Sequence, residues 1–89
     1  MPQAIVDPEE LARFASNLRQ FNVQLQEGML KLNGQFDQLS STWRDQEHQK
    51  FAQEYEQTMK VLTHFLQVSD QHIPFLLRKA QRVREYLSQ

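Results

Sequence analysis

Cysteine is absent from this chain, and glycine and proline are scarce. Without cysteine there is no disulfide, no thiolate metal ligand and no cysteine nucleophile. Only two glycines and three prolines occur in 89 residues. Because strands are separated by frequent turns, so few turn-forming residues argue against a β fold.

Long apolar runs are also missing, since none approaches the ~20 residues that span a bilayer. We therefore expect no membrane span. The first eight residues contain neither the basic nor the apolar region of a signal peptide, so any export is expected to proceed without a cleaved one. The formal net charge is only −1, so the surface as a whole does not attract nucleic acid or an anionic membrane.

The chain is nevertheless apolar enough to fold, with 39% hydrophobic residues in one small domain, residues 1–89. A first helix is predicted over about residues 8–40. Asp7 is a good N-cap, and Pro8 suits the first helical position. The following apolar residues recur every three or four positions, which is helical periodicity: Leu11, Phe14, Leu18, Phe21, Leu25, Met29, Leu32, Phe36 and Leu39.

The pattern breaks over about residues 41–45, where Ser41 and Thr42 favour a helix end. Asp45 is placed to cap a second helix over about residues 46–87, whose apolar residues again recur every three or four positions. Pro74 inside this helix predicts a kink there, and a break into two helices at Ile73 is the alternative.

Two long helices joined by a short turn must be antiparallel neighbours, so we predict an all-α antiparallel hairpin. Its apolar stripe is wider than one helix–helix contact can cover, and pairing of two hairpins into a four-helix bundle dimer would bury it. The second hairpin would be another copy or a similar chain. The predicted pairing face consists of Leu18, Phe21, Leu25, Leu32, Phe36, Phe51, Tyr55, Met59, Leu62, Phe65, Leu66 and Ile73.

Residues suited to chemistry do not form a recognisable site. His48, His64 and His72 are too far apart for a helical metal pair, which needs a spacing of three or four. Four basic residues near the end of the second helix suit the helix dipole better than a phosphate site: Arg78, Lys79, Arg82 and Arg84. We therefore expect no metal, no cofactor and no enzymatic activity.

A tryptophan midway along the chain, in the turn Trp43-Arg44-Asp45, completes a pattern that resembles the WXG family. These ESAT-like proteins are small substrates of type VII secretion. The resemblance covers the whole chain and implies an antiparallel homo- or heterodimer of helical hairpins, with a secretion component or a larger effector as further partners. Asp45 stands where the family has glycine. The family's export pattern, a tyrosine followed four residues later by an acid, is incomplete after Tyr86.

Three functions remain open at this stage. The first is a WXG protein of type VII secretion, found outside the cell, that acts through helix packing. The second is a cytoplasmic adaptor or structural dimer with the same fold and no export. The third is an amphipathic protein at a membrane surface. Trp43 either closes one end of the core or serves as a docking element for a partner.

Overall fold

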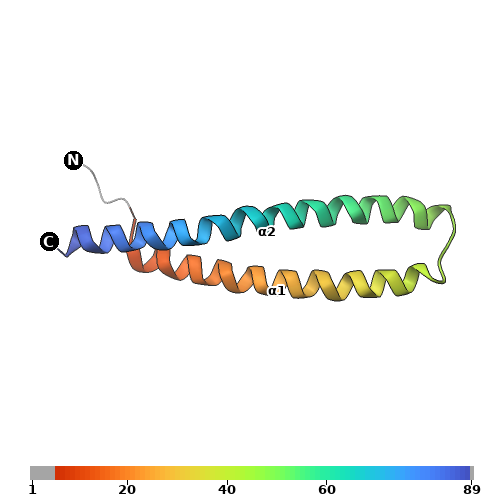
Figure 1. Ribbon diagram of the computed structural model, residues 1–89, viewed down its shortest axis with the longest axis horizontal. Coiled ribbons are helices and arrows are strands. Elements are labelled where there is room, and N and C mark those ends of the chain that lie inside the picture. Colours follow the sequence, from red (N-terminus) through yellow and green to blue (C-terminus); the bar gives the residue numbers. More distant parts are fainter. Residues whose placement is uncertain (1–5, 89) are drawn as a thin grey trace.

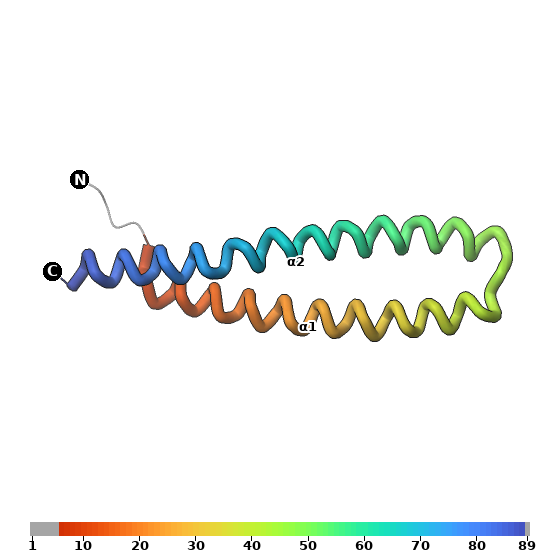
Figure 2. Tube along the Cα trace, in the orientation of Figure 1, coloured from red at the N-terminus to blue at the C-terminus, as the bar shows by residue number. Residues whose placement is uncertain are grey.

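The computed structural model describes residues 6–88 and shows an antiparallel hairpin of two helices, α1 (Pro8–Ser40) and α2 (Gln46–Leu87) (Figure 1). The described chain measures 66 × 22 × 15 Å. The two helices lie side by side along most of this length, and the end of α2 projects beyond the start of α1 (Figure 2). The predicted all-α hairpin is confirmed. Residues 1–5, where the sequence lacks a signal-peptide pattern, lie outside the described part.

Both helices begin at the predicted aspartates. The Asp7 carboxylate accepts from the backbone N–H of Glu9 at 2.8 Å, with Pro8 at the first helical position. The Asp45 carboxylate accepts from the backbone N–H of His48 at 3.0 Å. Each aspartate satisfies a backbone donor that the first turn of a helix leaves without a partner. α2 continues through Pro74, which excludes a break at Ile73.

The turn between the helices is short and has ordinary backbone angles. The N–H of Trp43 donates to the carbonyl of Leu39 at 3.0 Å, and the Ser41 hydroxyl donates to that of Gln38 at 2.7 Å. Asp45 has φ −97° and ψ −174°, which is extended backbone that any residue adopts. No residue in the described range 6–88 has a positive φ. The turn therefore does not require glycine at position 45.

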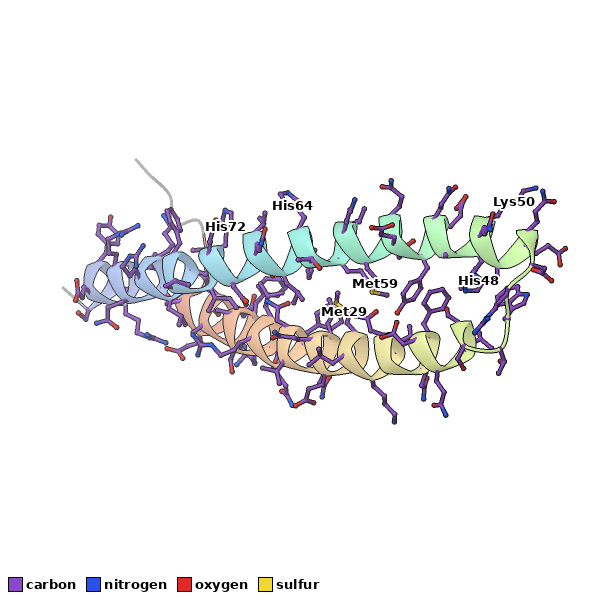
Figure 3. The ribbon with its side chains drawn as sticks, turned by 45° about the vertical axis from the view of Figure 1, so that its right-hand side comes forward. Met29, His48, Lys50, Met59, His64 and His72 are labelled. Atoms are coloured by element: carbon purple, nitrogen blue, oxygen red, sulfur yellow. The ribbon has the colours of Figure 1, made fainter. Side chains whose placement is uncertain are left out.

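The helices meet along an inner row of residues spaced alternately three and four apart, except for one step of seven between Met29 and Phe36. This is the heptad spacing of a two-stranded coiled coil. The row contains Ala15, Leu18, Asn22, Leu25, Met29 and Phe36 on α1, and Ala52, Tyr55, Met59, Leu62, Leu66, Ser69, Ile73, Leu76 and Ala80 on α2. Met29 and Met59 both point into the space between the helices (Figure 3).

Burial along the inner row is concentrated toward the chain ends. Ala15 and Ala80 are fully buried, and Ile73 is 2% exposed. No large side chain among the described residues is completely buried. The hairpin alone therefore leaves much of its apolar surface in water.

A polar layer interrupts the inner row in its half toward the chain ends. The Asn22 amide nitrogen donates to the Ser69 hydroxyl at 2.7 Å and to the Asp70 carboxylate at 2.9 Å. Asn22 is 3% exposed, and its side-chain oxygen has no hydrogen-bond partner among residues 6–88. A single buried asparagine in a coiled coil favours one register, because other registers leave its amide without partners. We infer that Asn22 aligns α1 with α2.

An ion pair joins the two helices near the chain ends. The Arg84 Nε lies 3.0 Å from a carboxylate oxygen of Glu9. The hydrogen bond and charge of Arg84 lower the pKa of Glu9, and Glu9 raises the pKa of Arg84. Since the Glu9 pKa is depressed on folding, its contribution is present above the unfolded pKa and is lost as pH falls through the folded one. Both groups are exposed to solvent, so this contribution is small.

Replacing the cap of α2 tests its importance. Asp45→Ala should lower the free energy of unfolding by ~0.5–2 kcal/mol, because the N–H of His48 loses its acceptor. Asp45→Asn should retain most of the stability, since its side-chain oxygen still accepts. Thermal unfolding followed by circular dichroism measures both variants. Equal melting temperatures for Asp45→Ala and the parent chain would show that the cap is unimportant.

Replacing the buried asparagine tests its effect on stability. Asn22→Leu should raise the melting temperature, because it removes a buried oxygen that has no partner. Asn22→Ala should lower it, because the smaller side chain leaves a void between the helices. A lower melting temperature for Asn22→Leu would mean that the bonds to Ser69 and Asp70 outweigh the unsatisfied oxygen.

Candidate functional site

Aromatic rings gather where the two helices approach the turn. We call Phe36, Trp43, His48, Phe51 and Tyr55 the turn cluster. The Phe36 ring stacks on Tyr55 at 4.5 Å between centroids and on His48 at 5.6 Å. Trp43 meets His48 edge-on at 5.1 Å and lies 6.2 Å from Phe51. Such aromatic contacts hold the turn at a defined position between the helix ends.

Two hydrogen bonds orient the polar members of the turn cluster. The His48 Nε2 is 2.7 Å from the Ser40 hydroxyl oxygen, which joins the start of α2 to the end of α1. The Tyr55 hydroxyl donates to the side-chain oxygen of Asn33. Both bonds cross between the helices, so the turn end is held by polar contacts as well as by stacking.

The three residues of the turn motif have different surroundings. Trp43 is half-buried against the other rings of the turn cluster, and Asp45 caps α2. Arg44 is exposed and donates to the backbone carbonyl of Ser41 at 3.2 Å, which closes the turn. Asp45 therefore has a structural role, whereas Trp43 keeps part of its indole available to a partner.

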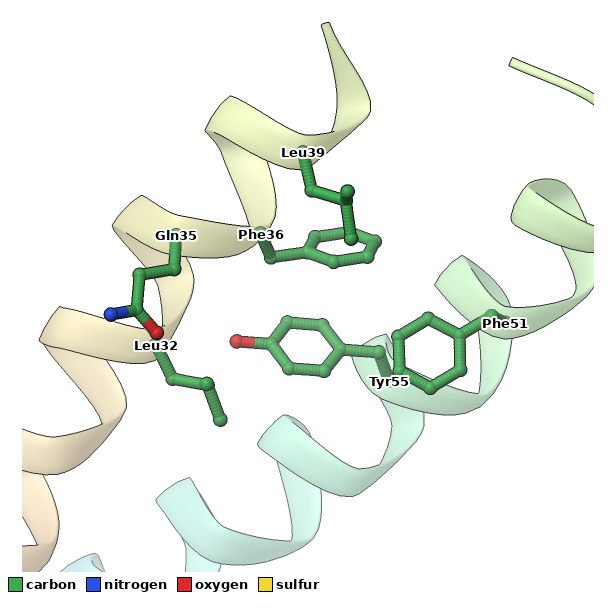
Figure 4. Close-up of a pocket in the computed structure, with 6 residues that line it drawn as sticks. All are labelled: Leu32, Gln35, Phe36, Leu39, Phe51 and Tyr55. Carbon is green, nitrogen blue, oxygen red and sulfur yellow. The ribbon is translucent and has the colours of Figure 1, made fainter. Parts of the chain in front are cut away.

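An apolar pocket opens beside the turn cluster, with a volume of about 310 Å³. It is lined by Leu32, Gln35, Phe36, Leu39, Phe51 and Tyr55 (Figure 4). Leu32, Leu39 and Phe51 are each nearly half exposed, so apolar surface borders solvent here. A pocket with this lining suits an apolar side chain of another protein.

The structure brings several members of the predicted pairing face together across the hairpin. Phe21 and Phe65 meet edge to face at 6.2 Å, and Phe36 lies 5.7 Å from Phe51. Both contacts join α1 to α2. Ile73 differs from the others, because it is already buried inside the hairpin.

The remaining members of that face divide into two groups. Phe21, Leu32, Phe51 and Phe65 are exposed. Leu18, Leu25, Phe36, Tyr55, Met59, Leu62 and Leu66 are half-buried. Apolar surface is therefore partly exposed along much of the hairpin.

Sequence reasoning missed two features of the hairpin, one between the helices and one on the outside of α2. Asn22 was not recognised as a buried partner of Ser69, although its spacing from Leu18 and Leu25 places it on the inner row. Val61, Val68 and Phe75 were also overlooked; they are 66%, 37% and 54% exposed on α2. Their regular spacing of seven was the signal that could have identified them.

The three histidines lie apart from one another along α2. His64 and His72 point away from α1 (Figure 3), whereas His48 belongs to the turn cluster. Within residues 6–88 no three His, Cys, Asp or Glu side chains converge as metal ligands. No helix in the same range is sufficiently long and apolar to cross a membrane. Of the basic residues near the end of α2, Arg84 pairs with Glu9.

Comparison with known proteins agrees with this geometry. The family model WXG100, described as proteins of 100 residues with WXG, matches residues 3–86. A crystal structure of the secreted protein ESXB from Bacillus anthracis str. Sterne, labelled with selenomethionine, has a TM-score of 0.73 and 24% identity, with 97% of this chain and 98% of that chain covered.

The wild-type form of the same protein, crystallised in space group P21, gives a TM-score of 0.75 and 25% identity, with 94% and 90% coverage. A search of curated proteins found no significant match. Since the family model spans nearly the whole chain and the solved structures share its hairpin, this protein belongs to the WXG100 family of small, ESAT-like helical proteins.

Proposed function

We propose that this protein is a non-enzymatic partner-binding protein of type VII secretion, which acts by packing its hairpin against a second hairpin. Membership of the WXG100 family supports a role in type VII secretion. The similar protein ESXB from Bacillus anthracis is a secreted protein. We extend secretion to this chain as part of the proposal.

The observation that carries the pairing is the incomplete burial of the hairpin. Among the described residues no large side chain is fully buried, while Phe14, Phe21, Phe51 and Phe65 are 58%, 51%, 47% and 41% exposed. Fully burying an exposed aromatic side chain contributes about 1.5–3 kcal/mol, and these half-exposed rings have roughly half of that still to gain. A second hairpin laid along this surface would supply that free energy and exclude water from the pocket beside the turn.

The oligomeric state of the full chain tests this function. Size-exclusion chromatography with light scattering should give a species heavier than the 10.6 kDa chain at micromolar concentration, either alone or with a partner hairpin. A monodisperse monomer of 10.6 kDa that is fully helical by circular dichroism and binds no second hairpin would contradict the proposal.

Export is tested separately, in a host with type VII machinery. The full chain should accumulate in the culture supernatant, and deletion of the secretion ATPase should retain it in the cell. Retention in both strains, combined with a stable dimer, would support the alternative of a cytoplasmic adaptor or structural dimer with the same fold.

Trp43 is the residue of the motif most suited to a partner. Trp43→Ala should weaken pairing or partner binding while the isolated hairpin remains helical, because Trp43 lies in the turn and is only half-buried. Trp43→Phe should retain part of the binding. Light scattering measures association, and circular dichroism measures helicity. Unfolding of the hairpin by Trp43→Ala would assign this residue a structural role instead.

A further inference from the structure

The basic residues of this chain are concentrated toward the end of α2. Residues 71–88 contain four of the ten Lys and Arg residues but only one of the eleven acids. The favourable interaction of a cation with the helix dipole is confined to the last turn of a helix. Arg84 is the one basic residue in the last turn of α2, and it is also the one that pairs with α1. The dipole therefore accounts for Arg84 but not for Arg78, Lys79 and Arg82.

These three cations share one side of α2 with two aromatic side chains. Phe75, Lys79, Arg82 and Tyr86 follow one another in steps of four, three and four residues, and Arg78 lies beside them. The steps make one row of about 16 Å along the helix. Phe75 and Tyr86 are 54% and 65% exposed, and the three cations are exposed as well. We call these five residues the basic–aromatic row.

The basic–aromatic row faces away from α1. At 100° per residue it lies about 130° around α2 from the inner row. The end of α2 also projects beyond the start of α1 (Figure 2), which keeps the far end of the row clear of the first helix. None of its members belongs to the predicted pairing face, whose last residue along α2 is Ile73. The row is thus a surface separate from that face.

No acid in the described part of the hairpin neutralises the three cations. The salt bridge found within residues 6–88 is that of Arg84. The nearest acid in the sequence, Glu85, accepts a hydrogen bond from Gln81 at 3.3 Å. Glu85 lies about 90° around the helix from the row. The row therefore presents positive charge that an anionic partner would complement.

The layout of the row distinguishes between kinds of anionic partner. A helix that lies on a membrane inserts a broad apolar face, whereas Phe75 and Tyr86 stand at opposite ends of the row with cations between them. Nucleic acid binding draws its affinity from many phosphate contacts, and three cations provide few. Carboxylates on a partner helix recur at the same steps of three and four, as in the ion pairs that flank coiled coils. An acidic helix with apolar residues beside its carboxylates fits the row best.

We propose that the basic–aromatic row binds an acidic amphipathic helix of a partner protein other than the paired hairpin. Carboxylates of that helix contact Arg78, Lys79 and Arg82, and its apolar residues contact Phe75 and Tyr86. The rings supply affinity, since exposed aromatic side chains are frequent anchors of interfaces. The charges determine which helices are accepted. The protein then joins its paired hairpin to an acidic partner at the end of α2.

Two synthetic helical peptides of equal length test this proposal. The first carries Glu every three or four positions beside a row of Leu, and the second has Gln in place of each Glu. Isothermal titration calorimetry with the full chain should give a Kd for the acidic peptide about ten-fold below that for the neutral one. This preference should shrink at 1 M salt, where the Debye length is about 3 Å.

Neutralising the cations tests whether the row is the surface that binds. A triple variant, Arg78→Gln with Lys79→Gln and Arg82→Gln, should raise the Kd of the acidic peptide about ten-fold and abolish its preference over the neutral one. Glutamine is a good helix former, so α2 should remain helical by circular dichroism.

A matched control removes the same charge from exposed positions on α1. It combines Arg13→Gln, Arg19→Gln and Lys31→Gln. This control should leave the Kd of the acidic peptide unchanged. An equal loss of binding in the control and in the α2 variant would show a general effect of net charge and would overturn the assignment to the row.

The aromatic members are tested separately from the cations. Tyr86→Ala should weaken both the acidic and the neutral peptide, because the ring contact does not depend on the charge of the peptide. Tyr86→Phe should retain most of the binding. Unchanged binding of both peptides to a Phe75→Ala, Tyr86→Ala double variant would remove the rings from the proposed site.

The outcomes distinguish this inference from the proposed function. Equal binding of the two peptides by the parent chain would overturn the inference. Binding to vesicles of phosphatidylcholine and phosphatidylglycerol, without binding of the acidic peptide, would assign the row to a membrane surface instead. In light scattering the triple α2 variant should keep the mass of the parent, and its failure to pair would place the row within the pairing surface. A parent chain that binds the acidic peptide but no second hairpin would overturn the proposed pairing alone.

Discussion

Two helices can contact each other along only one line, and this constraint underlies the other features of the protein. The buried residues of the inner row are mostly small or polar, namely Ala15, Asn22, Ser69 and Ala80, and Ile73 is the one larger residue buried with them. The larger aromatic and aliphatic side chains extend past the line of contact and remain partly in water. A hairpin built this way is elongated, because each added turn extends the contact without adding a layer above it.

At the turn end, where the side chains are large aromatic rings, specific contacts hold the two helices together. Stacking of Phe36 on Tyr55 and His48, together with the Ser40–His48 hydrogen bond, joins the last turn of α1 to the first turns of α2. Asp45 contributes by capping α2 in an extended conformation. The aspartate that replaces the family glycine is thus compatible with the fold, because this turn needs a cap acceptor more than it needs a left-handed backbone.

Much of the fold was predictable, because helical periodicity and end signals are local properties of the sequence. The caps at Asp7 and Asp45 and the short turn follow from residue type and spacing. The candidate surface was less predictable. Ile73 and Phe65 both belong to the three-and-four spacing of α2, yet Ile73 is buried and Phe65 is exposed. Burial depends on which side of α2 faces α1.

The sequence by itself determined the helices, their antiparallel order and the excess of apolar surface, because these depend on residue type, spacing and chain length. Only the tertiary structure decided how that apolar surface is divided. The rotation of α2 about its axis buries Ile73, brings Asn22 to Ser69 and Asp70, and leaves Val61, Val68 and Phe75 in solvent. That rotation depends on contacts between residues about 50 positions apart along the chain, such as Asn22 and Ser69 with their separation of 47, which no local pattern specifies.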